Sequence, residues 1–468
     1  MPAPAGVLRF IEENFSQTLD ALVELARIPG VSADGFDPFE VERSAEAVAV
    51  KVREAGLEGV EVLRVAGAHP YVVGEWLHAG PDAKTVLLYA HHDVQPPGRL
   101  DYWETPPFEP CVRDDGRLYG RGVVDDKAGI FVHLAAIRAF LETTKSLPLN
   151  VKVVIEGEEE IGSGHLAEFL AAHRERLAAD VIVLSDTANL ATGLPSLTTS
   201  LRGLVVVDIN VRALDHPVHS GMWGGPVLDA ATALAQVLAR LADETGRIKV
   251  PRLEADVPEV SPADRERLDA LPFDERAFRE DAGMWKDARF WGSPNESVYE
   301  RLWLRPAIAV TALEAMPLAD AANQLIAVAR ARVGLRLAPG QDARRARDCL
   351  MEELQRDPPA GVEVAVSCGT ATGGWRTEPE GPVFEAARRA LSKGYGRDPV
   401  AIGCGGTIPF VAPFAKELGG VPALLLGVED PACNAHGENE SLDIEDFRKA
   451  IDSTAHLFSE LAAVELYG

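Results

Sequence analysis

The sequence has few cysteines, few positive charges relative to negative ones, and no long run of apolar residues. Its five cysteines are odd in number and show no C-x-x-C spacing, which argues against a disulfide framework and against a thiolate zinc site. No window approaches the roughly 20 apolar residues that a transmembrane helix needs. The N-terminus lacks the basic and apolar regions of a signal peptide. We therefore expect a cytoplasmic protein with reduced thiols and no membrane partner.

Negative charge dominates the sequence, which has 46 lysine and arginine residues against 72 aspartate and glutamate residues. The formal charge of −26 argues against nucleic acid as a partner, because its phosphates would be repelled. The length of 468 residues exceeds the size at which one hydrophobic core stops growing, and 47% of the residues are hydrophobic. We therefore expect two domains, each with a core of its own.

Three short apolar runs of β-strand character each end in acidic or imidazole side chains. Residues 86–90 lead into His91, His92 and Asp93, residues 151–155 lead into the acidic segment 156–163, and residues 180–185 lead into Asp186. A single histidine or glutamate at a loop is usually a solvated surface residue, but three such strand ends make coincidence a weak explanation. Because ligand sites of open α/β sheets gather at the carboxyl ends of strands, the pattern predicts a metal or catalytic centre.

Helices and strands alternate along the first 200 residues, which predicts an α/β fold with a mixed, largely parallel sheet sandwiched by helices. The apolar spacing predicts an opening helix that ends near residue 28, helices at 41–55 and 128–141, and strands at 60–65, 70–75 and 85–90. The α/β pattern returns near residue 375, with helices at 382–391 and 444–463 and an apolar run at 421–426.

Between these segments the pattern becomes α+β. Strands are predicted at 204–211, 307–310, 326–337 and 362–367 and helices at 226–241 and 342–354, which is the order of a split βαβ unit. A polar insertion at 243–305 contains a helix start, with Ser261 as N-cap and Pro262 as the first helical residue. We expect a catalytic domain of residues 1–199 and 375–468 with an inserted lid domain of residues 200–374.

Eight short motifs occur in order along nearly the whole chain: YAHHDVQPP, YGRGVVDDK, EGEEEIGSG, VLSD, HPVHSG, NQ with GLRLAPGQD, GGTIP and NAHGENES. Each motif alone is a weak signal, but eight in register are highly specific. Together they resemble the co-catalytic two-zinc metallopeptidase family of carnosinases, cytosolic nonspecific dipeptidases, aminoacylases and succinyl-diaminopimelate desuccinylases. The DVQP sequence and the spacing of the motifs are most similar to those of the dipeptidase and carnosinase branch.

The resemblance implies two metal ions in each chain. His91 and Asp186 would bind the first metal, Glu160 and His436 would bind the second, and Asp125 would bridge the two. One imidazole and two carboxylates per metal, with the bridge counted twice, suit Zn²⁺, with Mn²⁺ or Co²⁺ as substitutes. His92 is the variable middle residue of its motif and would be a spectator.

The resemblance also implies catalytic roles. Asp93 would accept a hydrogen bond from the His91 imidazole and fix its tautomer. Glu159 would be the general base that takes a proton from a water bridging the two metals, so that a bridging hydroxide attacks the substrate. His219 in the inserted domain would polarise the scissile carbonyl, in this family usually at the site of a partner subunit. We therefore expect a homodimer formed through the lid domain.

The implied substrate is a dipeptide or short peptide with a free C-terminal carboxylate, cleaved at its amide bond. The resemblance implies that Asn323, Arg336, Gly406 and Thr407 hold this carboxylate, and a guanidinium suits the task because it forks onto both oxygens. The chain departs from the dipeptidase branch at Gly403 and Cys404, where an arginine-glutamate pair usually precedes the two glycines. This departure leaves the recognition of a substrate α-amine open.

Other functions fit the sequence less well. The main alternative is an N-acyl or N-succinyl amino-acid amidohydrolase, which would use the same site for another acyl group. A non-catalytic metal-binding relative is disfavoured, because every ligand position and the base are filled. A nucleotide-binding oxidoreductase is also disfavoured, because residues 120–125 have aspartate in place of the third glycine of the dinucleotide fingerprint and the chain has no G-K-[ST] motif.

Overall fold

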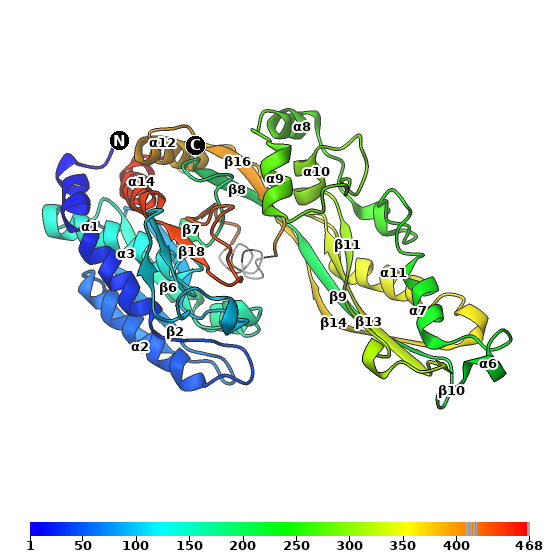
Figure 1. The fold of residues 1–468 in the computed structure, drawn as a ribbon. Coiled ribbons are helices and arrows are strands. Elements are labelled where there is room, and N and C mark those ends of the chain that lie inside the picture. The colour runs from blue at the N-terminus through cyan, green and yellow to red at the C-terminus, as the bar shows by residue number, and fades with distance from the viewer. Residues whose placement is uncertain (408–410, 412–413, 415–416, 418, 466–468) are drawn as a thin grey trace. The chain divides into compact units, whose positions relative to one another are not determined.

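The computed structural model describes residues 1–407, 411, 414, 417 and 419–465 (Figure 1). The chain divides into two units. The first unit consists of Met1–Thr199, Glu378–Ile402 and Ile408–Gly468, and the second consists of Ser200–Thr377 and Gly403–Thr407. Among the described residues, no helix has both the length and the apolar character needed to cross a membrane.

The first unit is built on a mixed sheet with the strand order β1-β2-β6-β3-β7-β17-β8. The four central strands β6, β3, β7 and β17 are parallel, and the strands at both edges are antiparallel to their neighbours. This topology confirms the predicted mixed, largely parallel sheet. The strands are β1 (Glu58–Leu63), β2 (Tyr71–Trp76), β3 (Thr85–His91), β6 (Asn150–Glu156), β7 (Val181–Ser185), β8 (Ser196–Leu201), β16 (Val400–Cys404) and β17 (Ala423–Leu426).

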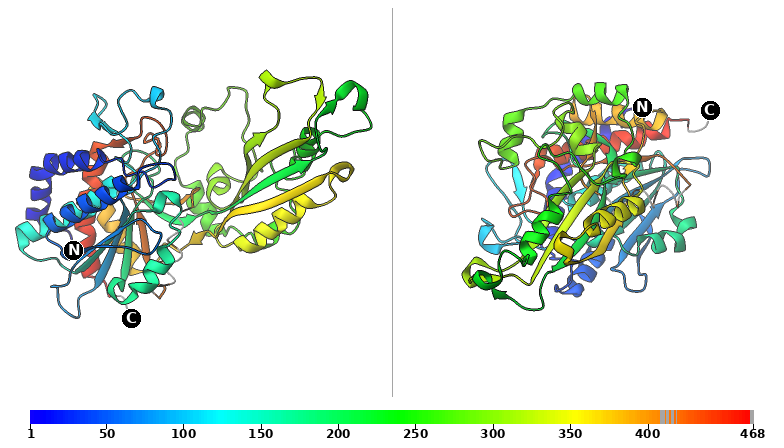
Figure 2. Two further views of the ribbon diagram at one scale, coloured as in Figure 1. Left: turned by 90° about the horizontal axis from the view of Figure 1, so that it is seen from below. Right: turned by 90° about the vertical axis from the view of Figure 1, so that its right-hand side faces the viewer.

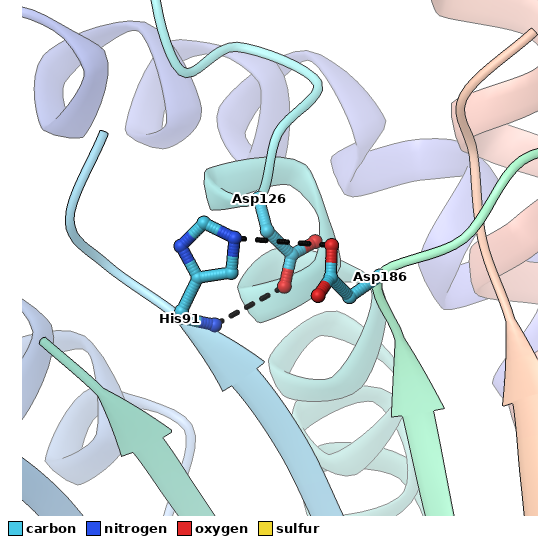
Figure 3. Close-up of side chains that lie close together, drawn as sticks. All are labelled: His91, Asp126 and Asp186. Atoms are coloured by element: carbon cyan, nitrogen blue, oxygen red, sulfur yellow. Dashed lines mark hydrogen bonds and ion pairs between the residues drawn. The ribbon is translucent and has the colours of Figure 1, made fainter. Parts of the chain in front are cut away.

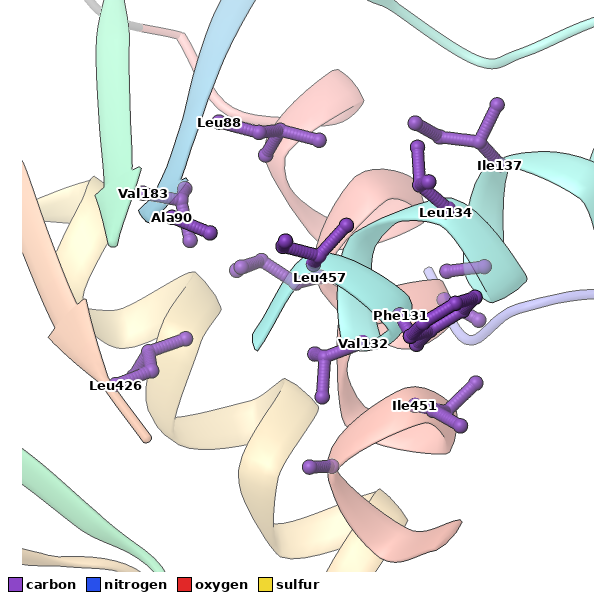
Figure 4. Close-up of a cluster of buried hydrophobic side chains, with 14 of the residues drawn as sticks. Leu88, Ala90, Phe131, Val132, Leu134, Ile137, Val183, Leu426, Ile451 and Leu457 are labelled. Atoms are coloured by element: carbon purple, nitrogen blue, oxygen red, sulfur yellow. The ribbon is translucent and has the colours of Figure 1, made fainter. Parts of the chain in front are cut away.

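Helices cover both faces of this sheet. On one face, Val86, Leu88 and Ala90 of β3 pack into a single core with side chains of the surrounding helices, as Figure 4 shows for α3 and α14. On the other face, Tyr71 of β2 stacks on Phe169 of α4 with ring centroids 4.0 Å apart. The helices of this unit are α1 (Ala5–Ala26), α2 (Pro38–Glu54), α3 (Lys127–Thr144), α4 (Leu166–Ala172), α5 (Arg174–Leu177), α12 (Pro382–Tyr395) and α14 (Ile444–Ala462).

Local capping explains where the helices differ from the predicted ranges. α2 begins at Pro38 rather than at residue 41, because the side chain of Asp37 accepts a hydrogen bond from the Phe39 N–H and proline is favoured at the first helical position. In the second unit, the helix predicted at 226–241 is shorter, because Asp229 caps it through the Thr232 N–H. The cap at Ser261 is present as predicted, since Ser261 and Asp264 form a reciprocal capping box.

The second unit contains a four-stranded antiparallel sheet with the order β11-β13-β9-β14, and α7 and α11 pack on one face of it (Figures 1 and 2). Along the chain the order is β9, α7, β11, β13, α11, β14, which is the predicted split βαβ unit. Its main elements are β9 (Gly203–Arg212), α7 (Ala230–Leu238), β11 (Ala307–Glu314), β13 (Val328–Leu337), α11 (Ala343–Gln355) and β14 (Glu363–Thr372).

Alternation along these strands separates the two faces of the second sheet. Val205, Val207 and Ile209 of β9 are buried against α7 and α11, whereas Asp208 between them is exposed. A smaller pair of strands, β10 (Val218–His219) and β12 (Gln324–Leu325), and several short helices complete the unit: α6 (Ser220–Trp223), α8 (Pro262–Asp269), α9 (Glu275–Asp281) and α10 (Val298–Trp303). β15 (Trp375–Arg376) pairs with Ser200 and Leu201 of β8.

A three-stranded sheet in the first unit combines a strand near the C-terminus with two strands near residues 111–119. It has the order β18-β5-β4, with β4 (Cys111–Val112), β5 (Arg117–Tyr119) and β18 (Ser441–Asp443). Ser441 pairs with Tyr119 and Asp443 pairs with Arg117. This pairing brings the segment before β18 close to the segment after β5, two segments that are more than 300 residues apart in the sequence.

Candidate metal centre

The predicted strand ends meet at one edge of the first sheet. His91 is the last residue of β3, Asp186 follows β7, and Glu159 and Glu160 lie in a 3-10 turn after β6. β3 is paired with β6 on one side and with β7 on the other, so the carboxyl ends of three adjacent parallel strands supply these side chains. Figure 3 shows His91 and Asp186 facing each other at this edge.

Asp125 lies between two histidines and presents one oxygen to each. Its Oδ1 lies 3.1 Å from His91 Nε2, and its Oδ2 lies 2.9 Å from His436 Nε2. Asp186 Oδ1 lies 3.8 Å from His91 Nε2, and Glu160 Oε2 lies 3.2 Å from His436 Nε2. The five residues that the motifs suggest as metal ligands therefore form one continuous cluster with Asp125 at its middle.

Asp93 is completely buried beside this cluster. The Nδ1 atom of His91 is 3.0 Å from the backbone carbonyl of Asp93 and 3.4 Å from its carboxylate, so the carbonyl is the nearer acceptor. The carboxylate instead accepts hydrogen bonds from the backbone N–H groups of Glu159 and Glu160 and from the Ser32 hydroxyl. Asp93 thus holds both the imidazole of His91 and the turn that carries the two glutamates.

A buried ion pair supports the other side of the cluster. The carboxylate of Glu440 accepts hydrogen bonds from Arg121 at 2.6 Å and from the backbone N–H of Asp125 at 3.3 Å. Arg121 also donates to the backbone carbonyls of His436 and Gly437. His436 has φ of 63°, a left-handed conformation that is unfavourable for a residue with a Cβ atom. The Arg121 contacts hold it there, so that its ring reaches Asp125.

Burial and mutual repulsion perturb the acids of the cluster. Burial raises the pKa of Glu159 well above its ordinary value, and the neighbouring Asp186 and Glu160 raise it further against the opposing effect of His91. Burial, together with Asp126 and Asp125, raises the pKa of Asp186 in the same way. Hydrogen bonds to Asp125 and Glu160 raise the pKa of His436 to about 11. So many buried carboxylates cannot all ionise without cations nearby, and their oxygen and nitrogen atoms are the donors that divalent transition metals bind.

Two further acids lie at the cluster that the motif analysis did not select. Asp126 accepts a hydrogen bond from the backbone N–H of His91 at 3.1 Å (Figure 3), and Glu429 groups with Asp125 and Asp186, with ligand atoms within 4.8 Å of one another. Burial, together with Asp125, raises the pKa of Glu429 to about 8. Glu429 comes three residues after β17, the fourth central parallel strand. The same strand-end signal that selected Asp186 could have found it.

The predicted residues of the second unit form two separate groups. His219 of β10 is exposed and pairs with Gln324 of β12, next to Asn323. Arg336 instead donates a hydrogen bond to the Thr407 hydroxyl at 2.9 Å, beside Gly406. β10 follows the end of β9 at Arg212, whereas Arg336 pairs with Leu204 at the start of β9. At about 3.3 Å per residue, the strand between the two groups spans roughly 25 Å, so Asn323 and Arg336 of one chain do not hold the same carboxylate.

The fold and this cluster together define an enzyme of the metallopeptidase class, with a buried site made of carboxylates and imidazoles. Residues 87–460 match the family model described as Peptidase family M20/M25/M40, and the chain belongs to this family. The chain is 34% identical to a cysteinylglycine-S-conjugate dipeptidase of Corynebacterium striatum over 86% of both chains.

Solved structures show the same fold. Human carnosine dipeptidase 1 superposes with a TM-score of 0.85 at 25% identity, covering 99% of this chain and 100% of that one. An M20 family metallo-carboxypeptidase from Sulfolobus solfataricus has a TM-score of 0.84 at 27% identity, covering 96% of this chain and 100% of that one. These similarities confirm the resemblance to the dipeptidase and carnosinase branch and the predicted fold class.

Proposed function

We propose that the protein is a two-metal peptidase that hydrolyses the amide bond of dipeptides or short peptides with a free C-terminal carboxylate. The observation that carries the proposal is the position of Asp125, whose two oxygens lie 3.1 Å and 2.9 Å from the Nε2 atoms of His91 and His436. A carboxylate directed at two imidazoles in this way suits a bridge between two cations. The mixture of imidazole and carboxylate ligands favours Zn²⁺, with Mn²⁺ or Co²⁺ as substitutes.

The proposed ligand set is the one expected from the motifs. His91 and Asp186 would hold one cation, Glu160 and His436 would hold the other, and Asp125 would serve both. Two divalent cations bound here supply Lewis acidity, which polarises the amide carbonyl and lowers the pKa of the attacking water. Glu429 and Asp126 lie beside the proposed ligands and, once ionised, would add negative charge that favours cations.

Glu159 is the proposed general base, taking a proton from the attacking water and passing it to the departing amine. It is the glutamate of the turn with no hydrogen bond to His436 or Gln95, whereas Glu160 has contacts with both. Burial raises the pKa of Glu159, as is usual for a carboxyl group that takes up and releases a proton in catalysis. The hydrogen bond from its backbone to Asp93 fixes the turn.

The second unit would contribute in two ways. Arg336, Gly406 and Thr407 would bind the C-terminal carboxylate of the substrate, with Thr407 holding the Arg336 guanidinium at 2.9 Å. His219 and Asn323 lie together at the separate β10–β12 pair, beyond the other end of β9, and cannot join Arg336 within one chain. We therefore propose that they act in the site of a partner subunit, with His219 polarising the scissile carbonyl. This requires a homodimer formed through the inserted unit.

To test the proposal, the zinc-loaded protein is assayed for hydrolysis of a panel of dipeptides and N-acyl amino acids. We expect turnover of dipeptides, and loss of turnover when the C-terminal carboxylate is amidated. Turnover of N-acyl or N-succinyl amino acids without turnover of any dipeptide would replace peptidase activity with amidohydrolase activity. Metal binding without turnover of any amide would contradict both activities.

A further inference from the structure

The outer face of the second sheet carries several arginines, and two of them on β13 are paired with acids. This face lies opposite α7 and α11, because the intervening β13 residues Ala331, Val333 and Leu335 pack against those helices. Arg332 binds Asp208 through two hydrogen bonds of 2.6 and 2.9 Å, and Arg330 lies 3.9 Å from Glu314. Arg336, on the same face, has no carboxylate within 4.0 Å among the described residues.

Arg202 is a second arginine without an acidic partner at the same end of the sheet. Arg202 directly precedes β9, in which Leu204 pairs with Arg336, and the two arginines are close enough for Arg336 to lower the pKa of Arg202. Thr407 links them, because its hydroxyl donates to the Arg202 carbonyl at 2.7 Å and accepts from Arg336. Arg202 is only 8% exposed, and its Nε donates to the Gly405 carbonyl. Within the described part of the chain, no carboxylate lies within 4.0 Å of it.

The two guanidinium groups repel each other. Burial and the neighbouring Arg336 lower the pKa of Arg202 to about 10, which leaves both groups charged at neutral pH. A buried charge is unfavourable unless a counter-charge compensates it. The Cys404 Sγ atom accepts a hydrogen bond from the backbone N–H of Gly406 at 3.3 Å, and this side chain brings no carboxylate to the two arginines. A carboxylate on a bound ligand would supply this compensating negative charge.

A ligand has room to reach Arg202. This residue lines a cavity of about 1010 Å³ in the second unit, together with Phe290, Trp291 and Leu302. Two of the three glutamates that line the cavity are engaged, since Glu254 pairs with Arg247 and Glu296 pairs with Arg305. The Arg202 guanidinium beside the apolar side chains of Phe290, Trp291 and Leu302 suits a short aliphatic chain that ends in a carboxylate.

We propose that Arg202 and Arg336 bind two carboxylates of one substrate, so that the preferred substrates are peptides with an acidic C-terminal residue. Arg336 takes the C-terminal carboxylate, and Arg202 takes the carboxylate of the C-terminal side chain. This inference rests on the proposed peptidase function and adds a substrate class to it. Two negative charges on the substrate match the two guanidinium charges, whereas a neutral C-terminal residue leaves Arg202 without a counter-charge.

The test compares kcat/KM for Ala-Glu with that for Ala-Gln, which has nearly the same shape without the side-chain charge. We expect at least a tenfold preference for Ala-Glu, the scale of one charge-assisted hydrogen bond. Arg202→Gln should bring the ratio close to one, chiefly by lowering kcat/KM for Ala-Glu. Cys404→Glu, which supplies a carboxylate beside the arginines, should also lower the ratio, whereas Cys404→Gln should not. Arg332→Gln on the same face should leave the ratio unchanged.

The outcomes separate this inference from the peptidase function. Equal kcat/KM for Ala-Glu and Ala-Gln, or a preference that survives Arg202→Gln in a folded variant, overturns the role of Arg202 and leaves the peptidase function standing. Thermal unfolding measured on each variant identifies those that are not folded, and Arg202→Lys then provides a milder change that should retain part of the preference. Hydrolysis of neither dipeptide, nor of any other dipeptide, overturns the peptidase function itself. N-acetylglutamate and N-acetylglutamine, assayed in parallel, test the same preference on an N-acyl substrate.

Discussion

The carboxylate of Asp93 accepts a hydrogen bond from the backbone N–H of Glu159 at 3.2 Å. The same carboxylate also accepts from the Glu160 N–H at 3.1 Å, while the backbone carbonyl of Asp93 lies 3.0 Å from His91 Nδ1. One buried residue therefore connects the proposed ligand of the first metal to the turn that carries the proposed base and a ligand of the second. Asp93 has a wider structural role than the orientation of one imidazole.

Asp93→Ala should weaken metal binding by about 10–100-fold, the usual effect of losing a group that orients metal ligands. The reason is that both His91 and the turn at Glu159 and Glu160 lose their support. Competition with a chelator of known affinity measures the change. Ser32→Ala removes only the 2.6 Å hydrogen bond to Asp93 and should have a smaller effect. Unchanged metal affinity in Asp93→Ala would show that the turn holds its shape without this residue.

Glu159→Gln and Glu160→Gln should have different effects. Because Glu159 is proposed to move protons, Glu159→Gln should retain both metals and lose orders of magnitude in kcat. Because Glu160 contacts His436 at 3.2 Å, Glu160→Gln should lose metal from one site. Metal content and kcat measured on both purified variants distinguish the two roles. If the effects are interchanged, the base and the ligand have been assigned one residue out of register.

His219→Ala and Glu159→Ala should each be nearly inactive alone and should regain activity when co-expressed. In a mixed dimer, one site has an intact Glu159 and receives His219 from the other chain, whereas the second site lacks both. Random pairing makes half of the dimers mixed, so the recovered activity should approach roughly a quarter of the wild-type value. Tagging the two chains differently allows mixed dimers to be purified. Inactive mixed dimers would show that His219 does not act across the interface.

Glu460 provides a test of pH-dependent stability. It is 3% exposed and binds Arg389 at 2.9 Å and Lys393. Although burial opposes ionisation, these partners lower the pKa of Glu460 to about 2 from its ordinary value of 4.5. Since the folded-state pKa is lowered, its stabilising contribution is complete above about pH 4.5 and is lost as the pH falls toward 2.

Glu460→Gln should therefore lower the free energy of unfolding at pH 7 by about 1–3 kcal/mol, and the difference from wild type should shrink below pH 4.5. Thermal unfolding at a series of pH values measures this difference. Glu445→Gln is the matched control, because Glu445 pairs with Arg448 at the surface and is 58% exposed. It should change the stability much less. A difference for Glu460→Gln that stays constant down to pH 2 would contradict the ion-pair explanation.

The metal cluster was accessible to sequence reasoning because its residues follow apolar strands. His91 ends a central parallel strand, Asp186 directly follows another, and the glutamate turn begins three residues after a third. Parallel strands place their carboxyl ends at one edge of the sheet. The family resemblance gave the register within the three consecutive glutamates, which periodicity alone does not fix. Glu429 lies three residues after the end of β17, the same spacing that Glu159 has from β6, and it was missed because none of the motifs that were selected contains it.

The second unit was harder to predict in detail. Its βαββαβ order follows from alternation and capping signals, but the distance between Asn323 and Arg336 depends on which strand ends they adjoin. Both residues belong to motifs close together in the sequence, yet the length of β13 separates them. Arg202 carried no motif signal, since only the pairing of β9 with β13 brings it beside Arg336. Contacts of this kind depend on strand register, and the sequence pattern does not determine them.

Elemental analysis of the purified protein, combined with activity after chelation, tests the two-metal centre most directly. The arrangement of Asp125 between His91 and His436 leads us to expect two transition-metal ions per chain. Exhaustive chelation should abolish activity and lower thermal stability, because the buried carboxylates would then repel one another, and two equivalents of Zn²⁺ should restore both. One metal ion per chain in the fully active protein, or full activity after exhaustive chelation, would contradict the two-metal centre.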